Sequence, residues 1–184
     1  MAPMVEQKPW TAAELGRLPK GWRYEIDEGK LVIMAPAGFR HGNNTNWVAY
    51  VLTGFVHSHG LGQVVSGEVG VCLQRDPQVL RGVDVAFYSN ERLARITDKN
   101  DFPEVPPDLA VEVHLPSEPD MERKVRQYLE AGVRSVWVID LRTCILTMHR
   151  PGQEPVTLSD PAATVLEPVL PGFSCHLAEI CGEA

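Results

Sequence analysis

Hydrophobic residues recur at helical spacing in two long stretches of the chain. The first covers residues 42–59, contains no proline and is followed by Gly60. This spacing predicts an amphipathic helix with one buried face. The second covers residues 118–131, where Pro119 suits a first helical turn and Gly132 suits the end of a helix. Two long helices are therefore predicted.

Shorter β-rich runs, separated by turn residues, predict strands. The first two flank Glu28-Gly29-Lys30, which predicts a hairpin with glycine at its tight turn. Before them, the capping-box spacing of Thr11-Ala-Ala-Glu14 predicts a short helix. The strands are predicted at residues 22–27, 31–34, 63–66, 69–73, 83–88, 109–115, 135–140 and 144–149, with a short helix around 91–96. We expect the three strands between 63 and 88 to form a meander. The order of elements predicts an α/β fold, in which helices flank a mixed β-sheet.

The composition suits one globular domain. Of the 184 residues, 44% are hydrophobic and 22% are charged. We expect an N-terminal helical segment (1–20), a core (22–150) and a C-terminal region of turns and edge pieces (151–184). The apolar runs are much shorter than the roughly 20 residues of a membrane span, and no signal peptide is evident. A soluble, cytoplasmic protein without membrane contacts is the expectation, and the four cysteines are interpreted as reduced.

The charge balance limits the ways in which the protein could bind nucleic acid. The net charge is −7 and the pI is near 5.3, which argues against coating nucleic acid through bulk electrostatics. An enzyme with a divalent cation remains compatible with this charge, because such a site gathers carboxylates. The basic residues that could contact a duplex are Arg40, Arg75, Arg81, Arg123, Lys124, Arg126, Arg134 and Arg142.

Two acids stand inside apolar predicted strands. Asp84 follows Val83 and shares a strand face with Ala86, and Glu112 shares a face with Ala110. A buried carboxylate needs a cation or a hydrogen-bond donor, so each acid could meet an arginine or a turn amide. The alternative is a shared Mg²⁺ or Mn²⁺ ion, for which carboxylates on a rigid sheet are suitable ligands. That alternative points to phosphoryl chemistry.

Several phrases along the chain together resemble a restriction-endonuclease-like, Uma2-type family of bacterial proteins within the PD-(D/E)XK nuclease superfamily. The resemblance covers nearly the whole chain and ends at Leu170-Pro-Gly-Phe173. Its other phrases are Arg23-Tyr-Glu-Ile-Asp27, Phe39-Arg-His-Gly42, Val83-Asp-Val-Ala-Phe87, Pro107-Asp-Leu-Ala-Val-Glu-Val113, Lys124-Val-Arg-Gln-Tyr128 and Ala131-Gly-Val-Arg-Ser-Val-Trp-Val-Ile-Asp140.

The resemblance implies a restriction-endonuclease-like core with a metal site. Asp84 and Glu112 correspond to the acidic ligands of Mg²⁺ or Mn²⁺, and the Val113 carbonyl to a third. Position 114 holds His where the simple pattern has lysine. The family resembles a variant of the PD-(D/E)XK pattern in which the lysine lies on the following helix. The resemblance therefore implies that Lys124 orients the attacking water. A solvated helix lysine is the alternative for Lys124.

Two further residues match the family. Glu25 is expected to be an extra metal ligand or a partner of Lys124, and the alternative is a surface strand acid. His41 is expected to contact a phosphate or a metal-bound water, unless it only caps or packs the helix. Asp108 follows a proline but is interpreted as a turn residue. The sequence departs from the pattern before the catalytic Asp, where Val83 replaces the usual Pro.

These observations predict a divalent-metal-dependent endonuclease that hydrolyses DNA. A homodimer would bring two sites to two strands. One alternative is a catalytically silent binding module with the same fold. The other is a metal-dependent hydrolase of small phosphate esters, which fits the acidic pI.

Overall fold

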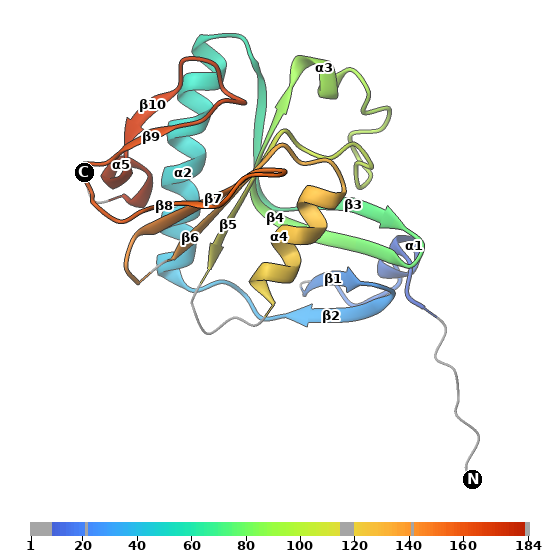
Figure 1. Cartoon of the computed structure of the whole chain (residues 1–184). Coiled ribbons are helices and arrows are strands. Elements are labelled where there is room, and N and C mark those ends of the chain that lie inside the picture. Colours follow the sequence, from blue (N-terminus) through green and yellow to red (C-terminus); the bar gives the residue numbers. More distant parts are fainter. Residues whose placement is uncertain (1–8, 21, 115–119, 141, 183–184) are drawn as a thin grey trace.

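The computed structural model describes residues 9–20, 22–114, 120–140 and 142–182, and shows an eight-stranded mixed sheet with helices on both faces (Figure 1). The helices are α1 (Ala12–Leu15), α2 (Phe39–Ser58), α3 (Asn90–Leu93), α4 (Met121–Glu130) and α5 (Leu177–Cys181). The strands are β1 (Arg23–Asp27), β2 (Lys30–Met34), β3 (Gly62–Arg75), β4 (Gln78–Ser89), β5 (Leu109–His114), β6 (Ser135–Asp140), β7 (Ile145–His149), β8 (Val156–Leu158), β9 (Thr164–Leu166) and β10 (Ser174–His176). The predicted mixed sheet flanked by helices is confirmed.

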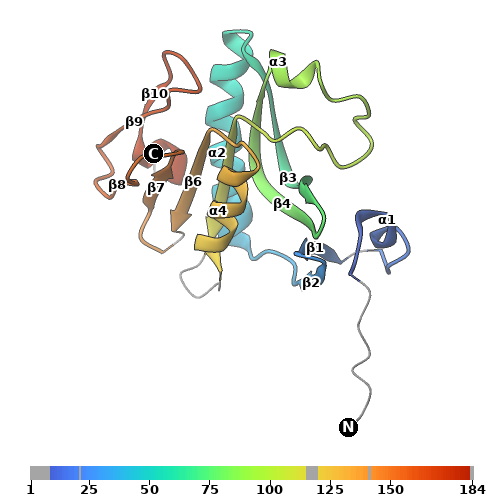
Figure 2. The same cartoon turned by 45° about the vertical axis from the view of Figure 1, so that its right-hand side comes forward.

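The two long helices cover opposite faces of the sheet, as the turned view also shows (Figure 2). Val85 and Phe87 of β4 pack in the same core cluster as the buried residues of α2. Ala86 of the same strand packs in the cluster that contains Val125 of α4. The predicted alternation therefore holds here, although Val83 packs in the α4 cluster and not, as expected, with Val85.

Strand β4 is the centre of the sheet, and its two edges are paired differently. Along one edge it pairs with β3 over its whole length. Along the other edge, β1 pairs at Leu80 and β5 pairs at Val85 to Phe87. Residues 81–84 therefore lie between the ends of two neighbouring strands. Backbone groups in this gap can be bonded by side chains instead of by a strand.

The predicted meander between residues 63 and 88 is wrong. Residues 63–66 and 69–73 belong to one long strand, β3, which forms a hairpin with β4. The register shifts between Ser66 and Val69, where Gly67 and Glu68 both have positive φ. A β-bulge of this kind bends a strand without reversing it, and so Gly67 and Glu68 do not form the expected turn.

The other elements agree closely with the sequence-based prediction. The capping box at Thr11 is present, and Glu28 and Gly29, with φ of 48° and 76°, form the tight turn of the first hairpin. Helix α2 begins at Phe39, a few residues before the predicted start. The first two residues of the second predicted helix, including Pro119, lie outside the described residues.

The C-terminal region contributes to the main core more than the prediction of turns and edge pieces suggested. Leu170, Phe173, Leu177 and Ile180 are buried in the cluster with α2. The interpretation of all cysteines as reduced is also corrected, because a disulfide joins Cys144 to Cys181. It links the turn before β7 to α5, which packs beside α2 in both views (Figures 1 and 2). None of the described helices is long and apolar enough to cross a membrane.

Candidate active site

Asp84 and Glu112 lie on neighbouring antiparallel strands where the sheet opens. The ladder between these strands ends at the pair of Val85 and Val111, and Asp84 and Glu112 are the next residue beyond it on each strand. The Val113 N–H donates to Asp84 Oδ2 at 2.8 Å, so this carboxylate occupies a backbone donor at the end of the ladder. Both acids are buried.

A second group of side chains surrounds Asp84. His41, from the first turn of α2, has its Nε2 3.3 Å from Asp84 Oδ2. Glu68 comes from the bulge of β3, and one ligand atom each of His41, Glu68 and Asp84 all lie within 4.8 Å of one another. We call these three residues the acid–histidine cluster. Two carboxylates and an imidazole at this separation are a donor set that suits a divalent metal ion.

The protonation of the acid–histidine cluster reflects its crowded negative charge. Burial, and after it the negative charge of Asp84, raise the pKa of Glu68 to about 8, although Arg23 opposes this rise. Burial also disfavours ionised Asp84, but the hydrogen bond and the charge of His41 outweigh it and lower the Asp84 pKa. The hydrogen bond to Asp84 raises the pKa of His41. The cluster thus holds protons that a bound cation would displace.

Glu112 is bonded to two side chains of α4. Lys124 Nζ lies 3.0 Å from Glu112 Oε2 and 3.1 Å from Glu25 Oε1, and Tyr128 donates its O–H to Glu112 Oε1 at 2.5 Å. Burial raises the pKa of Glu112 to about 7, and Lys124 acts against this rise. Burial lowers the pKa of Lys124, but the two carboxylates outweigh burial and raise it overall. Lys124 is therefore a cation throughout the physiological pH range.

Glu25 connects Lys124 to a buried arginine behind it. Arg81 Nη1 lies 2.9 Å from Glu25 Oε2, and its other nitrogens donate to Gln127. The Gly82 N–H donates to Glu25 Oε1 at 3.0 Å, within the gap between β1 and β5. A Cβ on Gly82 would lie 3.0 Å from Glu68 Oε2 and 3.6 Å from Glu25 Oε1. Because Gly82 has no side chain, the carboxylates of Glu68 and Glu25 can both lie close to its backbone.

Two cavities flank this arrangement. One, of about 590 Å³, is lined by residues of α1, by Glu68 and by the 100–102 loop. The other, of about 550 Å³, is lined by Lys124, His41, Arg40 and the segment 35–38 that leads into α2. Both are bounded by Arg23, Glu25 and Met34. The second cavity gives a solute access to both His41 and Lys124.

The structure brings all five predicted side chains of the site together, but in two subsets. Asp84 and His41 lie with Glu68, whereas Glu112 and Glu25 share Lys124. The set proposed for the metal was Asp84, Glu112 and the Val113 carbonyl, and this assignment stays a prediction. Sequence reasoning missed Glu68. Its signal was an acid between Gly67 and Gly70 in a valine-rich stretch, which is typical of a bulge beside a site.

Most of the basic residues predicted to contact a duplex are already paired. Arg123 pairs with Asp27 and Glu28, and Arg75 pairs with Glu104. The same is true of Lys124, Arg81 and Arg134. Asp108, interpreted as a turn residue, precedes β5, accepts the Ser89 N–H and pairs with Arg92 and Arg134, so it has a structural role.

A mixed sheet with helices on both faces, and with buried acids beside a gap in the sheet, defines an α/β protein with a candidate site in its sheet. The chain belongs to the Uma2 family, which is described as "Putative restriction endonuclease" and matches residues 12–178. A crystal structure from Anabaena variabilis, described as that of "a putative nuclease", has the same fold. It is 18% identical, with a TM-score of 0.77, over 95% of this chain and 99% of the other. A search of curated proteins gave no match.

Proposed function

We propose that the protein is a divalent-metal-dependent nuclease that hydrolyses phosphodiester bonds of DNA. The observation that carries the proposal is the acid–histidine cluster, which gathers around Asp84 beside the sheet gap in a member of the Uma2 family. A cation would relieve the repulsion between Asp84 and Glu68, which is strong enough to contribute to the raised Glu68 pKa. The two carboxylates suit Mg²⁺ or Mn²⁺, whereas the imidazole of His41 favours a transition-metal ion such as Mn²⁺ over Mg²⁺.

In this proposal Asp84, Glu68 and His41 hold the ion, and Glu112 lies on the neighbouring strand. When bound, the ion supplies Lewis-acid stabilisation to a phosphate oxygen and lowers the pKa of water. The Asp84 carboxylate is ionised at neutral pH, because its pKa is lowered. The Val113 N–H fixes its orientation. Asp84 would thus be a rigid anionic ligand in the middle of β4, next to the point where its pairing with β5 ends.

Lys124 is the cation that faces the reacting phosphate from α4. It lines the same cavity as His41, and its raised pKa keeps it protonated. A fixed ammonium group can orient water and stabilise the negative charge that develops on the phosphate in the transition state. Glu25 and Glu112 hold this ammonium group in place. Lys124 is therefore proposed as a catalytic residue and Glu25 as a positioning residue.

The experiment is cleavage of supercoiled plasmid with Mg²⁺ or Mn²⁺ at low salt. We expect Asp84→Asn and Glu68→Gln to lose at least a hundredfold in rate while their circular dichroism spectra stay unchanged. Glu104→Gln is the matched control, because Glu104 is also an arginine-paired glutamate but lies away from the acid–histidine cluster. Wild-type protein that cuts no DNA with either metal, or a Glu68 variant as active as the control, would contradict the proposal.

One observation favours a second candidate, a hydrolase of small phosphate esters. Of the cations that line the two cavities in the described part of the chain, Arg23, Arg81 and Lys124 are all ion-paired. Such a surface offers few contacts to a long duplex. Turnover of mononucleotides in the absence of plasmid cleavage would support this candidate and exclude the nuclease. The homodimer remains a prediction for either candidate.

A further inference from the structure

Arg40 differs from every other cation that lines the two cavities. It is exposed in the first turn of α2, immediately before His41, and borders the cavity that Lys124 also lines. Among the described residues, no carboxylate pairs with its guanidinium group. Arg23, Arg81 and Lys124, by contrast, are each held by buried or half-buried acids. Among the described arginines and lysines that line the two cavities, Arg40 is thus the one that remains available to a ligand.

The surroundings of Arg40 indicate what kind of ligand it can take. The wall beside it is formed by Ala35, Pro36, Ala37 and Gly38, which offer no charge of either sign. An anion bound at Arg40 would lie against this uncharged wall. The carboxylates that line the same cavity are Glu25 and Asp27, both paired with Arg81, and Asp120. Guanidinium groups bind phosphates through paired N–H donors, which makes phosphate a suitable anion. The adjacent residue, His41, belongs to the acid–histidine cluster.

We propose that Arg40 binds a substrate phosphate next to the scissile one, and that it is the main electrostatic contact between the protein and its substrate. This inference rests on the proposed nuclease function. A phosphate held at Arg40 would lie along the path from the open cavity to the acid–histidine cluster. Because the neighbouring cations are occupied, the substrate is gripped through a short footprint. This differs from duplex-binding proteins that neutralise about 6–10 phosphates.

The salt dependence of binding measures this contact directly. Each neutralised phosphate contributes a slope of roughly −0.7 on single strands and −0.9 on duplex in a plot of log K against log salt. A footprint governed by Arg40 predicts a shallow slope, of about −1 to −2, for the wild-type protein. Removal of the Arg40 charge should reduce this slope by about one and weaken binding about tenfold at low salt, or about 1.4 kcal/mol.

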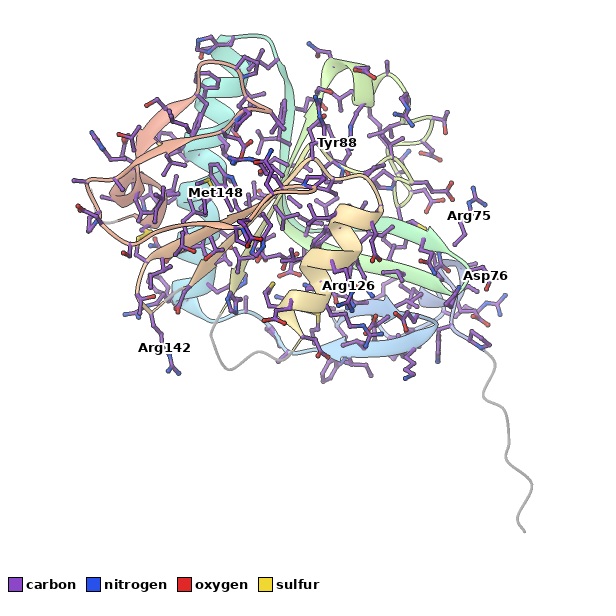
Figure 3. All side chains as sticks on the ribbon, viewed as in Figure 1. Arg75, Asp76, Tyr88, Arg126, Arg142 and Met148 are labelled. Atoms are coloured by element: carbon purple, nitrogen blue, oxygen red, sulfur yellow. A yellow bond between two sulfur atoms is a disulfide. The ribbon has the colours of Figure 1, made fainter. Side chains whose placement is uncertain are left out.

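The experiment measures binding of a fluorescein-labelled oligonucleotide, single-stranded or duplex, by anisotropy in EDTA over a series of KCl concentrations. It compares wild type, Arg40→Gln, Arg40→Lys and Arg126→Gln. Arg126 was also expected from the sequence to be a possible duplex contact. It is the matched control, because it is an exposed arginine on α4 that lines neither cavity (Figure 3). We expect Arg40→Gln to lose affinity and slope, Arg40→Lys to keep the slope, and Arg126→Gln to match wild type.

Cleavage by the same proteins separates this inference from the proposed function. With Mg²⁺ or Mn²⁺ we expect Arg40→Gln to raise KM about tenfold and to leave kcat within about twofold, since the contact exists before and during the reaction. If wild type cuts DNA but Arg40→Gln binds with unchanged affinity and slope, the inference is wrong and the nuclease stands. If wild type cuts nothing but shows the Arg40-dependent slope, the phosphate site stands and the nuclease fails. A wild-type protein that binds no oligonucleotide overturns the inference.

Discussion

Lys124 bridges two buried carboxylates, and its replacement by methionine tests how far they depend on its charge. Only 14% of the Lys124 side chain is exposed, and its Nζ contacts both Glu112 and Glu25. Loss of one partner from a buried ion pair costs about 3–5 kcal/mol. Glu25 keeps Arg81 and Glu112 keeps Tyr128. We therefore expect the lower end of this range, about 3 kcal/mol of lost stability at pH 8.

The effect of Lys124→Met should depend on pH because of Glu112. Burial raises the pKa of this carboxyl from 4.5 to about 7 in the folded protein. The folded state therefore binds the proton more tightly than the unfolded state, and stability falls as the pH rises from 4.5 towards 7. Without Lys124 the folded pKa rises further, so the penalty continues to grow above pH 7. At about 1.4 kcal/mol per pKa unit, the variant should lose about 1–2 kcal/mol more at pH 8 than at pH 6.

Urea unfolding in EDTA at pH 6 and pH 8 measures both effects. With a slope of about 2 kcal/mol per molar urea, a loss of 3 kcal/mol moves the midpoint by about 1.5 M. Glu112→Gln and the double variant complete a thermodynamic cycle, in which we expect a coupling energy of at least about 1 kcal/mol. Equal losses at the two pH values, together with additive single variants, would refute the reasoning and leave Lys124 with a packing role only.

Three further predictions concern the same residues. Glu68→Gln should weaken Mn²⁺ binding at least tenfold in calorimetry, and unchanged metal affinity would remove Glu68 from the ligand set. Without metal, the same substitution should stabilise the fold more at pH 8 than at pH 5, because the raised Glu68 pKa makes ionisation unfavourable in the folded state. Binding of Mn²⁺ at pH 7 should release about one proton, detected by calorimetry in buffers of different ionisation enthalpy, and a heat independent of the buffer would argue against the acid–histidine cluster. Tyr128→Phe should lower the free energy of unfolding by about 2 kcal/mol, because it removes a buried hydrogen-bond donor to Glu112. A loss below about 0.5 kcal/mol would show that this donor is dispensable.

The local sequence was sufficient for most of the secondary structure. The turn at Glu28-Gly29, the capping box at Thr11 and the two long helices follow from side-chain patterns within a few residues of one another. The same is true of the burial of Asp84 and Glu112, which stand in apolar strands. Such features depend on backbone propensity and on the period of the hydrophobic positions, and both can be measured along the chain.

Contacts between residues far apart in the sequence could be found only from the folded structure. Gly67 and Glu68 suggested a turn, and only the pairing of β3 with β4 over its full length showed that they form a bulge. That bulge brings Glu68 to Asp84, a contact that neither strand predicts alone. The disulfide between Cys144 and Cys181 likewise depends on how α5 packs beside α2.

The sequence by itself determined that this chain forms a mixed sheet flanked by helices and that Asp84 and Glu112 are unusual acids. The tertiary structure decided how those acids are partnered. Glu112 is shared between Lys124 and Tyr128, and Asp84 is placed with His41 and Glu68. The physical reason is that hydrophobic periodicity specifies which face of an element is buried. It does not specify which polar groups of other elements meet on that face, because this depends on strand order, register and the gap beside β4.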